Sequence, residues 1–256
     1  MFIGAVFLFF WLKVTRRSFP LHGWNKKNVF LYALGLWGFQ ICLFESIRLV
    51  GMSVGVTVAI ASSPIFTAIL ERIVRGKSPT GLWYVATAIA IAGIVLLNPI
   101  QSENASLTHF LCPLGAGFCS AVTLIVGSRL NADPTNPPES AVALVSLIAW
   151  MLFIPFFFFN DVAWIFTGSG LLSVVMLGLV NCALAYTLIL AGLRRTSASL
   201  SASLGLAEPM GAALIGILLL GENCSLRTIF GIAFVLFSVI LLIFVNNPIY
   251  IKTRRK

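Results

Sequence analysis

The sequence consists of long apolar runs separated by short polar connections. Nine runs, apolar on every side, cover residues 2–12, 29–50, 54–74, 82–97, 107–130, 140–159, 171–193, 198–220 and 229–245. Strands of a membrane barrel would alternate apolar and polar residues, and these runs do not. Because backbone polar groups find no water in lipid, such runs predict membrane-spanning α-helices.

The composition agrees with this prediction. Hydrophobic residues make up 59% of the 256 residues and charged residues 10%, whereas soluble domains carry roughly 25% charged residues. No connection between the runs is long enough to fold alone. We therefore expect an all-α integral membrane protein of about nine helices, surrounded by the lipid bilayer.

The net charge of +9 comes from basic residues in the short connections and at the C-terminal end, not from a basic domain. If the C-terminus is placed in the cytoplasm and successive helices alternate in direction, every Lys and Arg except Arg48 and Arg227 falls on the inner side. Short cytoplasmic loops of membrane proteins are enriched in Lys and Arg. The charge therefore indicates a cytoplasmic C-terminus, and it gives no support to nucleic acid as a partner.

An internal repeat relates the two halves of the chain. Pro209 follows Pro64 by 145 residues, Gly221 follows Gly76 by the same 145, and one more apolar run follows each glycine. Five helices per half is an odd number, so the second half is predicted to enter the membrane from the opposite side. Such inverted repeats place a binding site near the midplane, where the halves meet. The predicted domains are a first repeat at 1–100, a second repeat at 107–247 and a basic cytoplasmic tail at 248–256.

The first repeat is shorter than the second. The offset aligns the run 140–159 with the region of 2–12, and nothing in the first half aligns with 107–130. As a helix, 2–12 would be about 17 Å long, against a hydrocarbon core of about 30 Å. We expect that one helix and the start of the next are absent relative to a parent of two complete repeats, through a gene-model error or a real loss. A signal peptide fits less well, since charged residues follow this run and no small-residue cleavage site is seen.

The repeated motifs resemble those of the drug/metabolite transporter superfamily, and most closely its EamA-type branch. They run from Gly51-Met52-Ser53-Val54-Gly55 to Ser63-Pro64 in the first half, and from Ala198-Ser199-Leu200 to Glu208-Pro209 and Gly221-Glu222 in the second. The resemblance implies two inverted five-helix repeats and export of small metabolites such as amino acids, amines or drugs. Some members of the superfamily carry sugar phosphates or nucleotide sugars. Lys77 departs from the pattern, because the first repeat of the family usually has Glu after this glycine.

Polar residues recur near the middle of four predicted helices, at Gln40, Ser63, Asn181 and Glu208. Such groups cost several kcal/mol in hydrocarbon unless they face a cavity or a partner. They predict a substrate cavity at mid-depth, which Tyr186 is placed to line. Interhelical hydrogen bonds, or a chance alignment in depth, are the alternatives.

Glu208 is the sharpest candidate for a functional residue. It could bind a substrate ammonium group or exchange a proton; the alternative is a protonated structural residue bonded to a neighbouring helix. Pro64 and Pro209 each remove a backbone hydrogen bond and predict matched kinks suited to alternating access, although membrane helices also simply tolerate proline. Glu45 and Arg48, three residues apart, predict a structural ion pair.

Enzymatic chemistry finds little support in the sequence. Gly51-Met52-Ser53-Val54-Gly55 matches the G-x-S-x-G pattern, but it joins two apolar helices, where the chemistry needs a strand, a turn and a helix. A tight glycine turn explains it. Asp133 and Asp161 fall on opposite sides of the predicted topology, which argues against a transferase that clusters Asp residues around Mg²⁺. With no C-x-x-C pair and no P-loop, we expect no catalytic residue, no metal and no cofactor.

These observations predict a secondary transporter of small organic metabolites in a bacterial inner membrane. It would work by alternating access between two inverted halves. The family resemblance implies export, and the resemblance together with Glu208 indicates coupling to protons. A membrane interaction or regulatory protein without transport, and a carrier of nucleotide sugars or sugar phosphates, are the alternatives. The sequence leaves the substrate and the oligomeric state open, a homodimer included.

Overall fold

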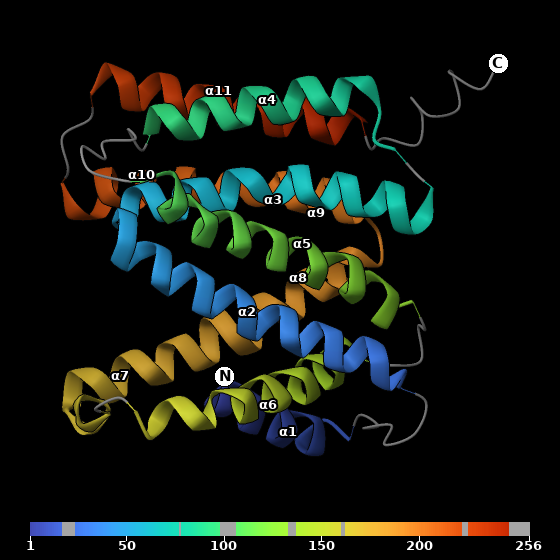
Figure 1. The fold of residues 1–256 in the computed structure, drawn as a ribbon, viewed down its shortest axis with the longest axis vertical. Helices are drawn as coiled ribbons and strands as arrows, with labels where there is room; N and C mark the ends of the chain where they lie inside the picture. The colour runs from blue at the N-terminus through green and yellow to red at the C-terminus, as the bar shows by residue number, and fades with distance from the viewer. Residues whose placement is uncertain are drawn as a thin grey trace. The chain divides into compact units, whose positions relative to one another are not determined.

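A computed structural model describes residues 1–16, 24–76, 78–97, 106–132, 137–159, 162–221 and 225–245. All regular structure in these ranges is helical (Figure 1). Some residues of the sequence predictions lie outside the described residues: Lys77, Asp133, Asp161, Glu222 and the tail 248–256.

Apart from the short 3₁₀ helix η2 (Ala163–Phe166), the helices follow the nine predicted runs, with ends that shift by at most a few residues. Six runs form single helices: α1 (Phe2–Val14), α2 (Lys26–Val50), α3 (Met52–Arg75), α4 (Gly81–Leu97), α6 (Pro138–Phe157) and α11 (Leu226–Val245). The other three change helix type: η1 (Leu107–Phe110) leads into α5 (Leu111–Leu130), α7 (Gly168–Met176) continues through η3 (Leu177–Ala185) into α8 (Tyr186–Leu193), and α9 (Ala198–Leu204) continues through η4 (Gly205–Ala207) into α10 (Glu208–Leu220).

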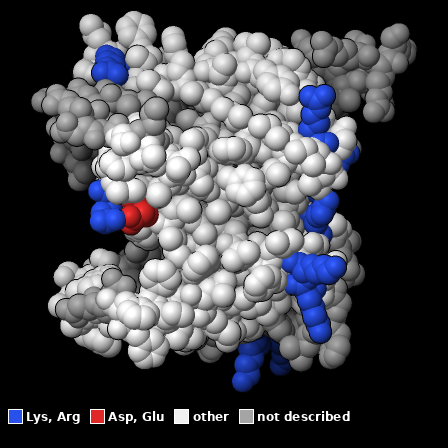
Figure 2. All heavy atoms as spheres, in the orientation of Figure 1, with Lys and Arg blue, Asp and Glu red and all other residues white. Residues whose placement is uncertain are grey.

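Seven of these helical stretches are long and apolar enough to cross a membrane, and the shorter apolar helices Phe2–Val14 and Gly81–Leu97 join them. Large apolar side chains such as Phe10, Phe44 and Ile73 are exposed. The face of the molecule drawn in Figure 2 carries few Lys, Arg, Asp or Glu side chains. Lipid, unlike water, solvates such a surface. The protein is therefore an all-α, multi-pass membrane protein, as predicted.

The chain forms two compact units, and each contains segments from both halves of the sequence. Unit 1 consists of Met1–Gly38 and Val122–Arg195, and unit 2 consists of Phe39–Ala121 and Thr196–Lys256. The helices α2 and α5 each contribute one end to each unit.

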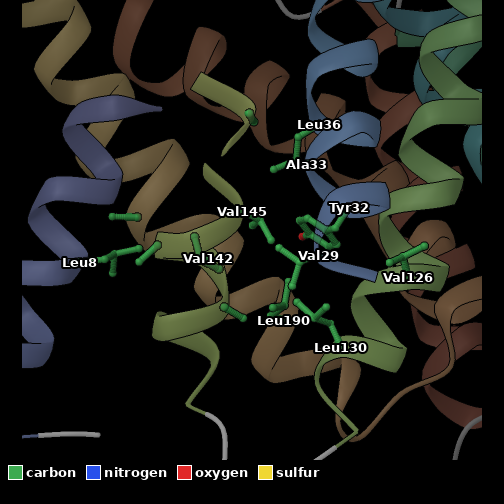
Figure 3. Packing of buried hydrophobic residues seen from close by; sticks show 14 residues of the cluster. Leu8, Val29, Tyr32, Ala33, Leu36, Val126, Leu130, Val142, Val145 and Leu190 are labelled. Carbon is green, nitrogen blue, oxygen red and sulfur yellow. The ribbon is translucent and has the colours of Figure 1, made fainter. Parts of the chain in front are cut away.

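Unit 1 is built around an apolar core between α1, α2, α5, α6 and the η3–α8 segment. Leu8, Tyr32, Val142 and Leu190 are among its buried members (Figure 3). Because lipid is as apolar as this core, close packing and not the hydrophobic effect holds such helices together. The contact of α1 with η3 is close, since a Cβ on Gly4 would lie 2.6 Å from the carbonyl oxygen of Gly178.

Unit 2 contains an antiparallel pair of helices, α4 and α11. A Cβ on Gly93 would lie 2.9 Å from the carbonyl oxygen of Gly231, so the two backbones approach closely here. Two turns further along, the Ser238 hydroxyl donates to the carbonyl oxygen of Ala86 at 2.8 Å. At the end of α4, the Arg227 Nε donates to the carbonyl oxygen of Leu96 at 2.9 Å and so satisfies a helix-terminal carbonyl.

The repeat offset of 145 residues exchanges the two contacts of this pair. It carries Ala86 onto position 231 and Gly93 onto position 238, so the contact of Ala86 with Ser238 is the image of the contact between Gly93 and Gly231. Gly76 and Gly221 also correspond, because both end a helix in the left-handed conformation, with φ of 64° and 69°. An antiparallel pair with exchangeable contacts is what two halves related by inversion require. The insertion of the complete halves in opposite directions stays a prediction.

Candidate functional site

The five residues predicted to line a cavity divide between the two units. Asn181 and Tyr186 belong to unit 1, and Gln40, Ser63 and Glu208 belong to unit 2. Their convergence on one cavity therefore stays a prediction.

Glu208 begins α10 directly after the 3₁₀ turn η4. Pro209 has no N–H, so it cannot donate to the carbonyl of Gly205 four residues earlier. The N–H of Glu208 bonds that carbonyl instead, and this shorter bond closes the 3₁₀ turn. The helix therefore changes type at the predicted proline, next to the carboxylate.

The Glu208 side chain is exposed, and it has no hydrogen bond or ion pair among the described residues. The other described acids are engaged: Glu45 pairs with Arg48, Glu71 bonds Ser199, and Glu139 has interactions of its own. Glu208 lies within the apolar stretch Ala198–Leu219. A carboxylate at such a position needs water, a substrate or a partner, because hydrocarbon does not solvate it.

Ser63 and Pro64 are buried in unit 2, and α3 runs through Pro64 without a change of helix type. The Ser63 hydroxyl donates to the Ser120 hydroxyl of α5 at 3.0 Å. Thr67 Oγ1 donates to the carbonyl oxygen of Ser63 at 2.7 Å. The contact between α3 and α5 is close, since a Cβ on Gly117 would overlap the Ser62 hydroxyl. The hydroxyl of Ser63 therefore takes part in helix packing. Gln40, also in unit 2, is half-buried and has no hydrogen bond among the described residues.

Asn181 lies inside the π-helical stretch η3 of unit 1. Its side chain is exposed and makes no hydrogen bond among the described residues, whereas the neighbouring Cys182 is buried and donates to the Ser146 hydroxyl at 3.3 Å. Tyr186 is half-buried and packs against the unit 1 core. Wide π-helical turns occur frequently at functional sites, because they redirect side chains and loosen the backbone ladder.

One polar contact of unit 2 was not expected from the sequence. Glu71 is 4% exposed, and its Oε2 accepts hydrogen bonds from the backbone N–H of Ser199, at 3.1 Å, and from the Ser199 hydroxyl. Arg75, one turn along α3, lies 3.6 Å from Glu71 Oε1. The carboxylate thus satisfies a donor in the first turn of α9, where the helix dipole favours a negative charge. In the sequence, the four-residue spacing of Glu71 and Arg75 within an apolar helix could have indicated a buried ion pair.

Two smaller predictions are confirmed. Arg48 Nε donates to Glu45 Oε2 at 3.0 Å, which is the predicted structural ion pair. Gly51 has φ of 85° between α2 and α3, so the G-x-S-x-G pattern is a glycine turn between helices and lacks the context of a nucleophile. The described residues hold no group of three or more His, Cys, Asp or Glu side chains placed to bind a metal ion.

Apolar helices and matched helix ends in the two halves define a multi-pass membrane protein built from an internal repeat. The chain belongs to the EamA-like transporter family, which it matches over residues 1–98 and 107–244. This confirms the resemblance seen in the sequence and the assignment to transporters and not to enzymes.

Individual relatives agree with the family. The chain is 32% identical over 240 residues to the uncharacterized transporter YwfM of Bacillus subtilis, covering 93% of this chain and 79% of YwfM. It is 27% identical over 231 residues to the threonine/homoserine exporter RhtA of Escherichia coli K12, covering 87% of this chain and 72% of RhtA. A solved crystal structure with 17% identity superposes with a TM-score of 0.76 over 94% of this chain and 85% of the other, which supports the fold alone.

Proposed function

We propose that this protein is a secondary transporter that exports small organic metabolites bearing an amino group, amino acids in particular. Membership of a transporter family supports the class, and the name of RhtA, a threonine/homoserine exporter, supports the substrate class and the direction. Transport would proceed by alternating access between two inverted halves. The membrane would be a bacterial inner membrane with the C-terminus in the cytoplasm, where short loops are rich in Lys and Arg.

The observation that carries this proposal is the exposed carboxylate of Glu208, for which the described part of the chain provides no hydrogen bond or ion pair. Such a group is stable within a membrane span only where water or a counter-charge reaches it. An ammonium group supplies that counter-charge, and ion-assisted hydrogen bonds are stronger than neutral ones. A sugar phosphate would instead bring negative charge to the carboxylate, so Glu208 favours an amine over the phosphate-bearing substrates of the wider superfamily.

Glu208 also offers a route to proton coupling. If a proton and the substrate ammonium compete for the same carboxylate, binding of one releases the other. Coupling then requires no second ionisable group in the site. Neutral hydrogen-bond donors and acceptors would complete the cavity, from Gln40, Asn181 and Tyr186. Ser63, whose hydroxyl donates to Ser120, would also line it.

Changes of helix type near Pro209 and Asn181 support movement at these two positions. The 3₁₀ turn before Pro209 and the π-helical turns around Asn181 both interrupt the regular ladder of hydrogen bonds in a long helix. Such interruptions are where helices bend. Pro64 would act as the matched kink of the first half.

Flux into proteoliposomes tests the proposal. Radiolabelled threonine and homoserine serve as probes, with Glu208→Gln as the variant and Glu45→Gln as the matched control, because Glu45 is an acid at the end of another span and pairs with Arg48. Glu208→Gln should reduce amino-acid flux about tenfold, the effect of losing roughly one charge-assisted hydrogen bond. Glu45→Gln should leave it within about twofold, as exposed pairs contribute little.

The two parts of the proposal fail separately. Wild-type protein that moves neither these nor other amines would rule out the amine carrier and favour a non-transporting role. Normal amino-acid flux in Glu208→Gln, with the pH dependence of the wild type, would remove Glu208 from the site and end the coupling proposal.

A further inference from the structure

A polar hollow lies at one end of unit 1, and none of the predicted cavity residues lines it. Ser128, Asn131, Ala132, Leu193 and Arg194 line it, where α5 and α8 end, and its volume is about 280 Å³. One water molecule occupies roughly 30 Å³ of liquid, so the hollow has room for a larger polar group. Its lining is mixed, with an amide, a hydroxyl and a guanidinium beside the apolar Leu193 and Ala132.

Hydrogen bonds fix the two main polar side chains of this hollow. Asn131 is 4% exposed, and its Nδ2 donates to the carbonyl oxygen of Leu190. The amide oxygen of Asn131 is thereby turned toward Arg194, whose Nε donates to it at 2.9 Å. An arginine held through Nε presents its planar guanidinium in a set direction, which suits two-point binding of a phosphate.

The surroundings of the hollow are strongly basic. Arg129 and Arg195 are exposed on either side of it in sequence, at the same helix ends. The acid Glu139, at the start of α6, is the one acidic residue in the described part of unit 1. Two helix C-termini also meet at the hollow, and each contributes about half a negative charge. Three guanidinium groups outweigh these partial charges, so the net field at this end favours an anion.

We propose that this hollow binds the headgroup of an anionic phospholipid. Arg194 and Asn131 would hold the phosphate, Arg129 and Arg195 would add charge, and Leu193 would contact the start of the acyl chains. The topology prediction places these helix ends at the cytoplasmic interface, where basic pockets between helices meet anionic headgroups. Mixed polar and apolar walls fit a lipid better than a free ion, which would use the polar walls alone.

Native mass spectrometry of the purified protein tests this inference. The probes are phosphatidylglycerol, the zwitterionic phosphatidylethanolamine and inorganic phosphate. Arg194→Gln removes the held charge, and Arg48→Gln, at an exposed ion pair of the other unit, is the matched control. We expect the wild type to retain phosphatidylglycerol in preference to phosphatidylethanolamine, Arg194→Gln to retain it about fivefold less, and Arg48→Gln to match the wild type.

A second variant keeps the test decisive if Arg194→Gln fails to fold. Arg129 and Arg195 are exposed, so replacing both with Gln should leave folding intact and weaken phosphatidylglycerol retention by a similar factor for each charge. Equal retention of both lipids by the wild type, or unchanged phosphatidylglycerol retention in the variant that folds, would overturn the proposal. Binding of inorganic phosphate that displaces the lipid completely would show an ion site and would overturn the lipid assignment.

Discussion

Glu71 of α3 accepts two hydrogen bonds from Ser199 of α9, one from the backbone N–H and one from the hydroxyl. The two residues lie on the third helix of the first half and on its repeat counterpart in the second half. A buried carboxylate thus fixes one helix of the repeat to the beginning of the other. The contact lies within unit 2.

Removal of this carboxylate should destabilise the protein. Glu71→Ala leaves the buried N–H and hydroxyl of Ser199 without an acceptor, which costs about 1–3 kcal/mol. Glu45→Ala is the matched control, because Glu45 also pairs with an arginine on its own helix but is exposed to solvent. Thermal unfolding in detergent should show a lower midpoint for Glu71→Ala and an unchanged midpoint for Glu45→Ala. Equal midpoints for the two variants would contradict a structural role for Glu71.

The close approach of α4 and α11 should depend on glycine. A Cβ on Gly93 would lie 2.8 Å from a methyl group of Val235 and 2.9 Å from the carbonyl oxygen of Gly231, so Gly93→Ala should push the helices apart and cost about 1–3 kcal/mol. Gly211→Ala is the control, since a Cβ there meets nothing within 4 Å. Alanine at this helical position should even stabilise the protein by up to about 1 kcal/mol. The same unfolding assay checks both, and a destabilisation by Gly211→Ala equal to that by Gly93→Ala would argue against this packing.

Much of the fold could be predicted because lipid imposes a simple rule on the chain. Every span must satisfy its own backbone, so apolar length alone locates the helices. The repeat offset then predicted Gly76 and Gly221 as equivalent positions, and both are left-handed helix ends. Glycine serves best there because it adopts positive φ without strain.

The details of the candidate site were less accessible to sequence. Asn181 predicted a polar group within a membrane span, but the sequence did not predict the π-helical turns around it. Helix type there depends on packing against other helices, such as the contact of Cys182 with Ser146. Glu71 and Asn131 were passed over for a similar reason. Their partners, Ser199 and Leu190, are distant in sequence, and only tertiary contact joins them.

Asn181 and Cys182 should separate transport from stability. Asn181→Ala changes an exposed side chain without a hydrogen bond among the described residues, so it should lower amino-acid flux severalfold and leave the unfolding midpoint unchanged. Cys182→Ala removes a buried thiol that contacts Ser146, so it should reduce the free energy of unfolding by about 1 kcal/mol and lower the midpoint. Proteoliposome flux and thermal unfolding are measured for both variants. Loss of stability in Asn181→Ala, with flux reduced only in proportion to folded protein, would point to a packing role.

An engineered disulfide should be able to cross-link α2 and α5 where they are in contact. The Cys42 sulfur lies 3.2 Å from the place of a Cβ on Gly115, which is close enough for a second sulfur attached there to reach the bonding distance of about 2.05 Å. In a background with Cys112→Ser and Cys119→Ser, we expect Gly115→Cys to cross-link to Cys42 on treatment with copper phenanthroline, which accepts the two electrons released by the thiols. Peptide mass mapping before and after reduction identifies the bond.

The control for this cross-link is Gly211→Cys in the same background, since no atom lies within 4 Å of a Cβ at that position. It should remain reduced under the same oxidant. A bond between Cys42 and position 211, or none at position 115 while the protein stays folded, would show that α2 and α5 do not pack as described. A bond at position 115 alone would fix the register of these two helices within unit 2, because residues one turn away on α5 are displaced by about 5 Å.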